Sequence, residues 1–81
     1  MKIIAFSGNW VLVDTKTEFI FYNYQDRITL KHKKKDNPDL DVASVAKWGY
    51  YRLEKPVEIS SFNEVNRKLV NKAKKGNIAH P

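Results

Sequence analysis

Apolar and polar positions alternate along the first third of the chain and predict a series of β-hairpins. The segment KIIAFSGNWVLVD predicts a hairpin with Gly8 and Asn9 at its tip, because both residue types tolerate a positive φ. A second turn is expected in DTKT, with residues 15–16 at its tip, and a third in YQD, with residues 25–26 at its tip. A loop of three residues at YQD would instead swap the faces of the fourth strand, whereas two or four residues would not. The pattern thus predicts four antiparallel strands before residue 36.

These turn positions fix an expected register, in which directly opposed residues share a face of the sheet. The expected pairs include Ile4–Val13 in the first hairpin, Leu12–Phe19 in the second and Phe21–Leu30 in the third. One face is then apolar and predicts a core, formed by Ile3, Ala5, Trp10, Leu12, Phe19, Phe21, Ile28 and Leu30. The other face begins apolar, with Ile4, Phe6, Val11, Val13 and Ile20, and becomes polar and cationic, with Tyr22, Tyr24, Arg27, Thr29, Lys31 and Lys33. Since the first two strands are apolar on both sides, other elements must cover them.

The middle of the chain predicts a loop followed by a fifth strand. DNPDLD is rich in turn formers, and its Asn-Pro step disfavours a helix before the proline. In VASVAKWGYYRLEKP, Gly49 and the neighbouring aromatic residues favour a strand from about 45 to 54. Apolar residues at helical spacing leave a short helix at 39–46 as the alternative.

The last third of the chain predicts an amphipathic helix. Ser61 and Glu64 have the spacing of a capping box, and Gly76 is a natural C-cap. Between them, one stripe is apolar and consists of Phe62, Val65, Leu69, Val70 and Ala73. This stripe is expected to cover one apolar side of the sheet.

Together these elements predict an α+β fold: a small antiparallel β-meander or barrel-like sheet of about five strands, with one C-terminal amphipathic helix packed on it. At 81 residues we expect a single domain over 1–76 and a tail at 77–81. The chain has no cysteine, which excludes disulfides, thiolate zinc sites and cysteine nucleophiles. It also has no apolar run of the roughly 20 residues that span a bilayer. We therefore expect a cytoplasmic protein that does not associate with a membrane.

The net charge of +6 is concentrated in two segments. Residues 27–35 carry +5 and residues 65–81 carry another +5, whereas residues 1–26 carry −1 and residues 36–64 carry −3. Such clustering suits a polyanion such as DNA or RNA, or an acidic patch on a partner protein. The charge pattern by itself does not choose between these partners.

Aromatic and basic residues on the same strands favour nucleic acid, because bases stack on aromatic faces while lysine and arginine neutralise phosphates. The candidate binding residues on the early strands are Tyr22, Tyr24, Arg27, Lys31, Lys33, Lys34 and Lys35. A second set is Trp48, Tyr50 and Arg52, which alternate onto one side if they form a strand, and a third is Arg67, Lys68, Lys72 and Lys75 on the helix. The structural alternative is that the aromatics build a small β core and the lysines keep strand edges and the helix surface soluble.

Two further functions are compatible with this sequence. The same basic face suits a protein-binding inhibitor or adaptor of the phage or plasmid type, docking on an acidic surface of a host protein, and a homodimer joined through a sheet edge is also possible. A small ribonuclease toxin would combine His32 with Tyr22, Tyr24 and Arg27 as acid–base and phosphate-binding groups. The acidic loop DNPDLD lacks the glycine and distal glutamate of a calcium loop. We therefore predict a non-catalytic binding protein without a metal or cofactor.

Overall fold

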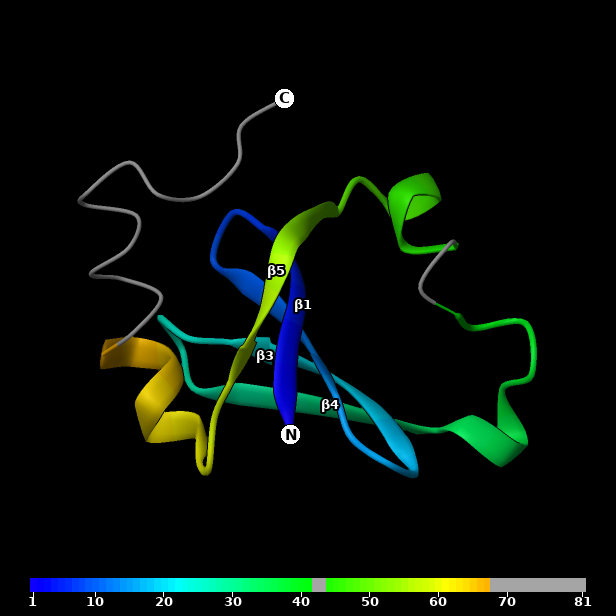
Figure 1. The fold of residues 1–81 in the computed structure, drawn as a ribbon, viewed down its shortest axis with the longest axis horizontal. Helices are drawn as coiled ribbons and strands as arrows, with labels where there is room; N and C mark the ends of the chain where they lie inside the picture. Colours follow the sequence, from blue (N-terminus) through cyan, green and yellow to red (C-terminus); the bar gives the residue numbers. More distant parts are fainter. Residues whose placement is uncertain (42–43, 68–81) are drawn as a thin grey trace.

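The computed structural model describes residues 1–41 and 44–67, and its main element is a five-stranded antiparallel sheet (Figure 1). The strands are β1 (Lys2–Ser7), β2 (Trp10–Asp14), β3 (Glu18–Asn23), β4 (Ile28–Lys33) and β5 (Tyr51–Glu58). Their order is β4-β3-β2-β1-β5, so β4 and β5 are the two edges of an open sheet. Two 3-10 helices, η1 (Lys34–Asp36) and η2 (Ser44–Trp48), lie between β4 and β5, and a short helix spans 62–67. The predicted antiparallel sheet of about five strands is confirmed.

The first hairpin has the predicted tip but also contains a β-bulge. Gly8 has a φ of 57°, as the first central residue of a type II′ turn requires. The pairs Ser7–Trp10, Phe6–Val11 and Ala5–Leu12 form as expected. The register then shifts, and Val13 pairs with Ile3, so the expected pair Ile4–Val13 is wrong. Because an extra residue reverses the alternation of side chains, Ile3 and Ile4 exchange their predicted faces.

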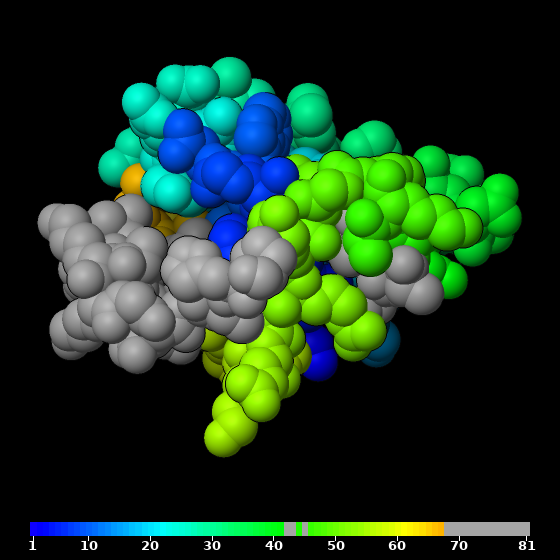
Figure 2. Space-filling view, turned by 90° about the horizontal axis from the view of Figure 1, so that it is seen from above, coloured from blue at the N-terminus to red at the C-terminus, as the bar shows by residue number. Residues whose placement is uncertain are grey.

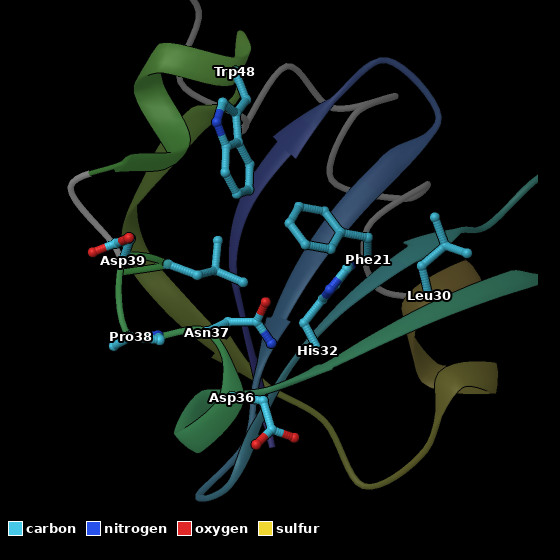
Figure 3. Close-up of a pocket in the computed structure, with 9 residues that line it drawn as sticks. Phe21, Leu30, His32, Asp36, Asn37, Pro38, Asp39 and Trp48 are labelled. Atoms are coloured by element: carbon cyan, nitrogen blue, oxygen red, sulfur yellow. The ribbon is translucent and has the colours of Figure 1, made fainter.

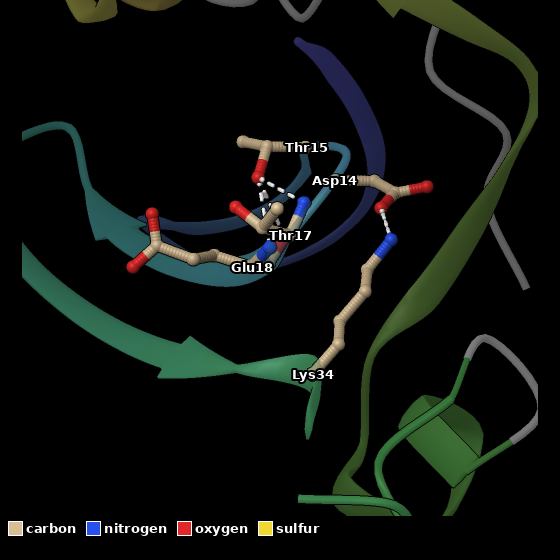
Figure 4. Close-up of polar contacts among 5 residues, drawn as sticks. All are labelled: Asp14, Thr15, Thr17, Glu18 and Lys34. Atoms are coloured by element: carbon tan, nitrogen blue, oxygen red, sulfur yellow. Dashed lines mark hydrogen bonds and ion pairs between the residues drawn. The ribbon is translucent and has the colours of Figure 1, made fainter. Parts of the chain in front are cut away.

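The second hairpin is out of its expected register by two residues. Leu12 pairs with Phe21 instead of Phe19, because the loop is longer than the two residues predicted. The hydroxyl of Thr15 holds this loop: it accepts hydrogen bonds from the Glu18 N–H (2.9 Å) and the Thr17 N–H (3.3 Å), and it donates to the Glu18 carbonyl (3.1 Å; Figure 4). A shift of two residues leaves every side chain on its predicted face.

The third hairpin has the predicted register, with the pairs Phe21–Leu30, Ile20–Lys31 and Phe19–His32. The buried side chain of Asn23 fixes the turn, since its Oδ1 accepts hydrogen bonds from the backbone N–H groups of Gln25 (3.1 Å) and Asp26 (3.0 Å). This arrangement is an Asx turn, which sets the loop length and therefore the pairing.

One face of the sheet packs against the short helix, and we call this layer the helix-side core. Its buried members are Ile3, Val11, Val13, Ile20, Tyr22, Ile59 and Val65, with Phe62 packed against them. The ring of Tyr22 stacks on that of Phe62 with centroids 4.7 Å apart, and its hydroxyl donates to Asn66 Oδ1 at 3.1 Å. Tyr22 is therefore a core residue, which corrects the expectation that it lies on an open polar face.

The start of the helix is capped one residue earlier than the sequence predicted. The carboxylate of Glu64 accepts hydrogen bonds from the N–H of Ser60 (3.0 Å) and from its hydroxyl (2.8 Å), where Ser61 was expected to take part. Of the predicted apolar stripe, Phe62 and Val65 pack as expected. The rest of the stripe, the C-cap and the tail at 77–81 fall outside the described residues.

The opposite face forms a second layer, the loop-side core, under the connection between β4 and β5. It contains Ile4, Ala5, Leu12, Phe19 and Phe21, with Trp10, Leu40 and Tyr50 packed against them. Ile28 and Leu30 were predicted to belong to this core, but they are 47% and 50% exposed. They lie on the edge strand β4, and residues 34–41 leave the sheet at the far end of this strand and run beyond it (Figure 1).

The fifth strand begins later than its expected range of 45–54. Residues 44–48 form η2, whose start is fixed by a hydrogen bond from the Ser44 N–H to Asp41 Oδ1 (2.8 Å). Gly49 follows with a φ of 83°, which breaks the extended backbone, so β5 begins at Tyr51. The alternative of a short helix is correct in kind, although it falls at Ser44–Trp48. In the described part of the chain, no helix is long and apolar enough to cross a membrane.

Candidate functional site

Exposed cations follow the outer edge of the sheet along β4, and we call this surface the basic edge. Its members are Lys16, Arg27, Lys31, Lys33 and Lys35, all exposed. β4 pairs only with β3 among the described strands, so its other side is free of a neighbouring strand. The first of the two predicted basic clusters therefore lies at an accessible edge.

Arg27 lies in the turn between β3 and β4, next to the short helix. Its Nη1 donates a hydrogen bond to Asn63 Oδ1 at 3.2 Å, which directs the guanidinium toward the helix. Its backbone has a φ of 57°, a left-handed conformation that costs about 1–2 kcal/mol for a residue with a side chain. The arginine is thus held at one end of the basic edge.

Lys31 and Lys33 project from the middle and far end of β4 toward the helix side of the sheet. Lys31 pairs with Ile20, and Lys33 pairs with Glu18, the carboxylate directly opposite on β3. Within the part of the chain that the structure describes, neither lysine forms an ion pair within 4.0 Å. Both ammonium groups are therefore available to a partner.

Lys34 differs from its neighbours because its charge is already paired (Figure 4). Its Nζ forms an ion pair with Asp14 Oδ1 at 2.6 Å and lies 4.7 Å from the centroid of the Phe19 ring. The side chain crosses the loop side of the sheet and joins η1 to the end of β2. Lys34 is therefore a structural residue, although the sequence included it among the binding residues.

At the end of β4, four lysines surround a shallow concavity of about 450 Å³, which we call the lysine hollow. It is lined by Lys16, Thr17, Glu18, Lys33, Lys34 and Lys35. Lys16 comes from the turn between β2 and β3, which the longer Thr15 loop brings beside η1. Lys16 is not among the binding residues predicted from the sequence, because its place beside the lysines of 33–35 depends on the tertiary fold.

A second concavity of about 520 Å³ lies on the loop side of the sheet, and we call it the aromatic pocket (Figure 3). Its apolar lining comes from Phe21, Leu30, Pro38, Leu40 and Trp48, and its polar lining from His32, Asp36, Asn37 and Asp39. Figure 3 shows the rings of Trp48, Phe21 and His32 around the opening, while the carboxylates of Asp36 and Asp39 point away from it. The segment that forms its outer wall projects from the sheet (Figure 2).

Phe21 is the centre of the aromatic group at this pocket. Its ring centroid lies 5.3 Å from that of His32, 5.6 Å from that of Tyr50 and 5.7 Å from that of Trp48. Trp48 is 51% exposed although it touches this group. Burial raises the pKa of the Tyr50 hydroxyl above its ordinary value.

The residues of the ribonuclease hypothesis are not brought together. His32 lies on the loop side of the sheet against Phe21, whereas Tyr22 and Tyr24 pack on the helix side. Tyr24 is partly buried, and its hydroxyl donates to the Gly8 carbonyl at 3.4 Å. The sheet thus separates the histidine from the two tyrosines that would have shared its site.

The remaining candidates are distributed over both ends of the molecule. Arg52 is exposed on the edge strand β5, opposite Ala5 and on the loop side, the side that Trp48 and Tyr50 also contact. Arg67 is exposed at the end of the described helix. Lys68, Lys72 and Lys75 fall outside the described residues. Across 1–41 and 44–67, no group of three or more His, Cys, Asp and Glu side chains is placed to hold a metal ion.

Comparison of the chain with known protein families, curated proteins and solved structures finds no match.

Proposed function

We propose that this protein binds nucleic acid without catalysis, with backbone phosphates lying along the basic edge. The observation that carries the proposal is a row of exposed cations along β4, an edge strand without an outer neighbour among the described strands. Lys31 and Lys33 lie on the strand, Arg27 lies in the turn before it and Lys35 lies in η1 after it. Lys31 and Lys33 are two residues apart on one face, which separates them by about 7 Å along the strand. Flexible lysine side chains at this separation can reach neighbouring phosphates.

The electrostatics of the edge support phosphate binding. Lys31, Lys33 and Lys35 form no ion pair with another described residue, so a phosphate does not have to displace an internal carboxylate. Each phosphate that a lysine neutralises releases condensed counterions, which makes affinity fall with salt. Contacts of this type fix the position of a strand without reading its sequence. We therefore propose a binder with little sequence preference.

The test is a comparison of two double variants that remove the same charge. One is Lys31→Ala with Lys33→Ala on the basic edge, and its control is Lys47→Ala with Lys55→Ala, two exposed lysines on η2 and on the opposite edge strand β5. Fluorescence anisotropy with labelled single-stranded DNA, duplex DNA and RNA is measured between about 50 and 200 mM salt. The basic-edge variant should bind more weakly than the control, and on a single strand its salt slope should fall by about 1.4, or 0.7 for each lost contact.

Two results contradict this proposal. In one, none of the three probes binds at the lowest salt. In the other, both double variants lose the same affinity and the same salt slope, so that only the total charge of the protein matters.

A second candidate function is supported by the apolar residues on the same strand. Ile28 and Leu30 are 47% and 50% exposed on β4, and an exposed edge strand can accept a strand from a partner protein. The partner would place acidic residues opposite the lysines of β4. This is the inhibitor or adaptor alternative, and it becomes the leading proposal if the nucleic-acid probes fail to bind.

A further inference from the structure

We propose that the aromatic pocket holds an unpaired base of a single-stranded nucleic acid, whose phosphates continue onto the lysine hollow. This inference rests on the proposed function and names its ligand as a single strand. The two concavities lie next to each other, because Lys33–Lys35 line one and Asp36–Leu40 line the other. A strand can therefore place its base on the aromatic side and its phosphate on the cationic side of η1.

The shape and lining of the pocket suit a flat ring. Its volume of about 520 Å³ lies within the range of about 300–1,000 Å³ that is typical of small-molecule sites. Trp48 and Phe21 both line the pocket, and their ring centroids lie 5.7 Å apart. Aromatic side chains in this position offer π-faces on which any base can stack.

Part of the apolar lining of the pocket is exposed to solvent. Leu30 and Trp48 line it and are 50% and 51% exposed. A concave patch of this kind, with a few polar groups at its border, marks a ligand site on small domains. Here the polar groups are the ring nitrogens of His32 and the amide of Asn37, which both line the pocket (Figure 3).

These polar groups are held in place by the protein itself. Asn37 Nδ2 donates to the carbonyl of Lys33 at 2.8 Å, which ties the amide to the end of β4. The His32 ring is fixed by its edge-to-face contact with Phe21. Both side chains can form hydrogen bonds with the edge of a base once it has left the stack. In a duplex the Watson–Crick edge of a base is occupied by its partner and its faces are covered by stacking, so we expect the pocket to select single strands over duplexes.

The charges around the pocket set the direction of the strand. Asp39 lines the outer wall of the pocket and would repel a phosphate there. The border at η1, where Asp36 follows Lys34 and Lys35, leads to the lysine hollow, which contains four lysines and one carboxylate, Glu18. The phosphate is therefore expected on the side of Lys33 and Lys35, away from the acidic loop.

The experiment uses Trp10→Phe as the parent protein, because the chain has two tryptophans and Trp48 then becomes the only one. The probes are a 12-nucleotide thymidine strand and the same strand with abasic sites, which keeps the phosphates and removes the bases. Quenching of Trp48 fluorescence reports entry of a base, and anisotropy of a labelled strand reports total binding. The intact strand should quench Trp48 and bind about 5- to 150-fold more tightly than the abasic strand.

Two variants of the full chain make the assignment specific. Trp48→Ala should abolish the preference for the intact strand, while Trp48→Phe should keep most of it. The matched control is Tyr51→Ala, since Tyr51 is also an exposed aromatic (44%) but contacts Phe6, which packs on the helix side of the sheet. It should leave the preference unchanged. If Trp48→Ala does not fold, the abasic comparison in the parent protein decides the question.

The outcomes separate the two proposals. Equal binding of the intact and abasic strands without quenching overturns the base pocket and leaves phosphate binding at the basic edge in place. Absence of binding by either strand overturns the proposed function and the base pocket together. Quenching by an acidic peptide, but by neither strand, assigns the pocket to a protein partner and also overturns the inference.

Discussion

Replacement of Tyr22 tests whether this residue supports the core or contacts a ligand. Its ring is 2% exposed and stacked on Phe62 at 4.7 Å, so truncation to alanine removes a large buried group beneath the helix. Loss of a buried aromatic side chain costs about 3–5 kcal/mol of unfolding free energy. An 81-residue domain has roughly 4–12 kcal/mol in total, so Tyr22→Ala should remove a large part of its stability.

The variant Tyr22→Phe isolates the hydroxyl. It removes the hydrogen bond to Asn66 Oδ1 at 3.1 Å and keeps the ring in its place. We expect a loss of about 1 kcal/mol, which corresponds to a decrease in Tm of about 4–8 °C for a domain of this size. Tyr24→Phe is the control, since its hydrogen bond to Gly8 is long (3.4 Å) and exposed, and its loss should change stability little.

The assay is urea unfolding followed by tryptophan fluorescence and circular dichroism, combined with oligonucleotide binding under native conditions. In the folded protein, Tyr22→Phe should leave nucleic-acid affinity unchanged, because the hydroxyl faces the helix. If Tyr22→Ala instead unfolds at the same urea concentration as the parent protein and binds oligonucleotides more weakly, Tyr22 does not support the core. Tyr22 would then act as a surface stacking residue, as the sequence pattern had suggested.

Two further predictions concern the first turn and the loop-side core. Gly8→Ala should lower the free energy of unfolding by about 1–2 kcal/mol, because a residue with a Cβ is strained at the φ of 57° that Gly8 adopts. Nothing lies within 4 Å of the added Cβ, so the substitution introduces no steric clash. An unchanged urea midpoint would contradict this prediction. For Tyr50, the folded pKa is raised above the unfolded value of 10.0, so the folded state retains the proton longer. Stability should be full below about pH 10 and fall as pH rises toward the folded pKa, whereas Tyr50→Phe should remove this part of the alkaline loss, as measured by urea unfolding at a series of pH values.

The antiparallel sheet could be predicted because its strands and turns are specified by residues that are close together in the sequence. Alternating side chains define strands, and the turn formers at Gly8 and Asn23–Asp26 define where the chain reverses. The third hairpin shows this best, since its pairing follows from the loop length alone. The predicted register of the second hairpin was wrong by two residues, because the Thr15 hydroxyl stabilises a longer loop. Threonine is also common in strands, so the residue type alone does not indicate this loop.

The cationic character of β4 was likewise evident from the sequence, and its lysines are exposed as predicted. The function of this surface stays a proposal. The sequence could not tell that Lys34 is paired with Asp14, twenty residues earlier, or that Lys16 lies beside the end of β4. The ion pair and the position of Lys16 both depend on how the turn between β2 and β3 packs against η1.

Local sequence patterns specify the positions of the strands, through alternating apolar and polar residues, as well as the turns between them and the segments where charge is concentrated. Only the tertiary structure shows which aromatic residues are buried and which are exposed. Tyr22 and Trp48 are both aromatic residues near basic ones, yet the helix covers Tyr22 and leaves it 2% exposed, while Trp48 is 51% exposed beside a pocket. Burial of a side chain depends on which distant segment of the chain packs on its face of the sheet. The alternation of apolar and polar residues along a strand specifies the two faces, but it does not specify the segment that covers each of them.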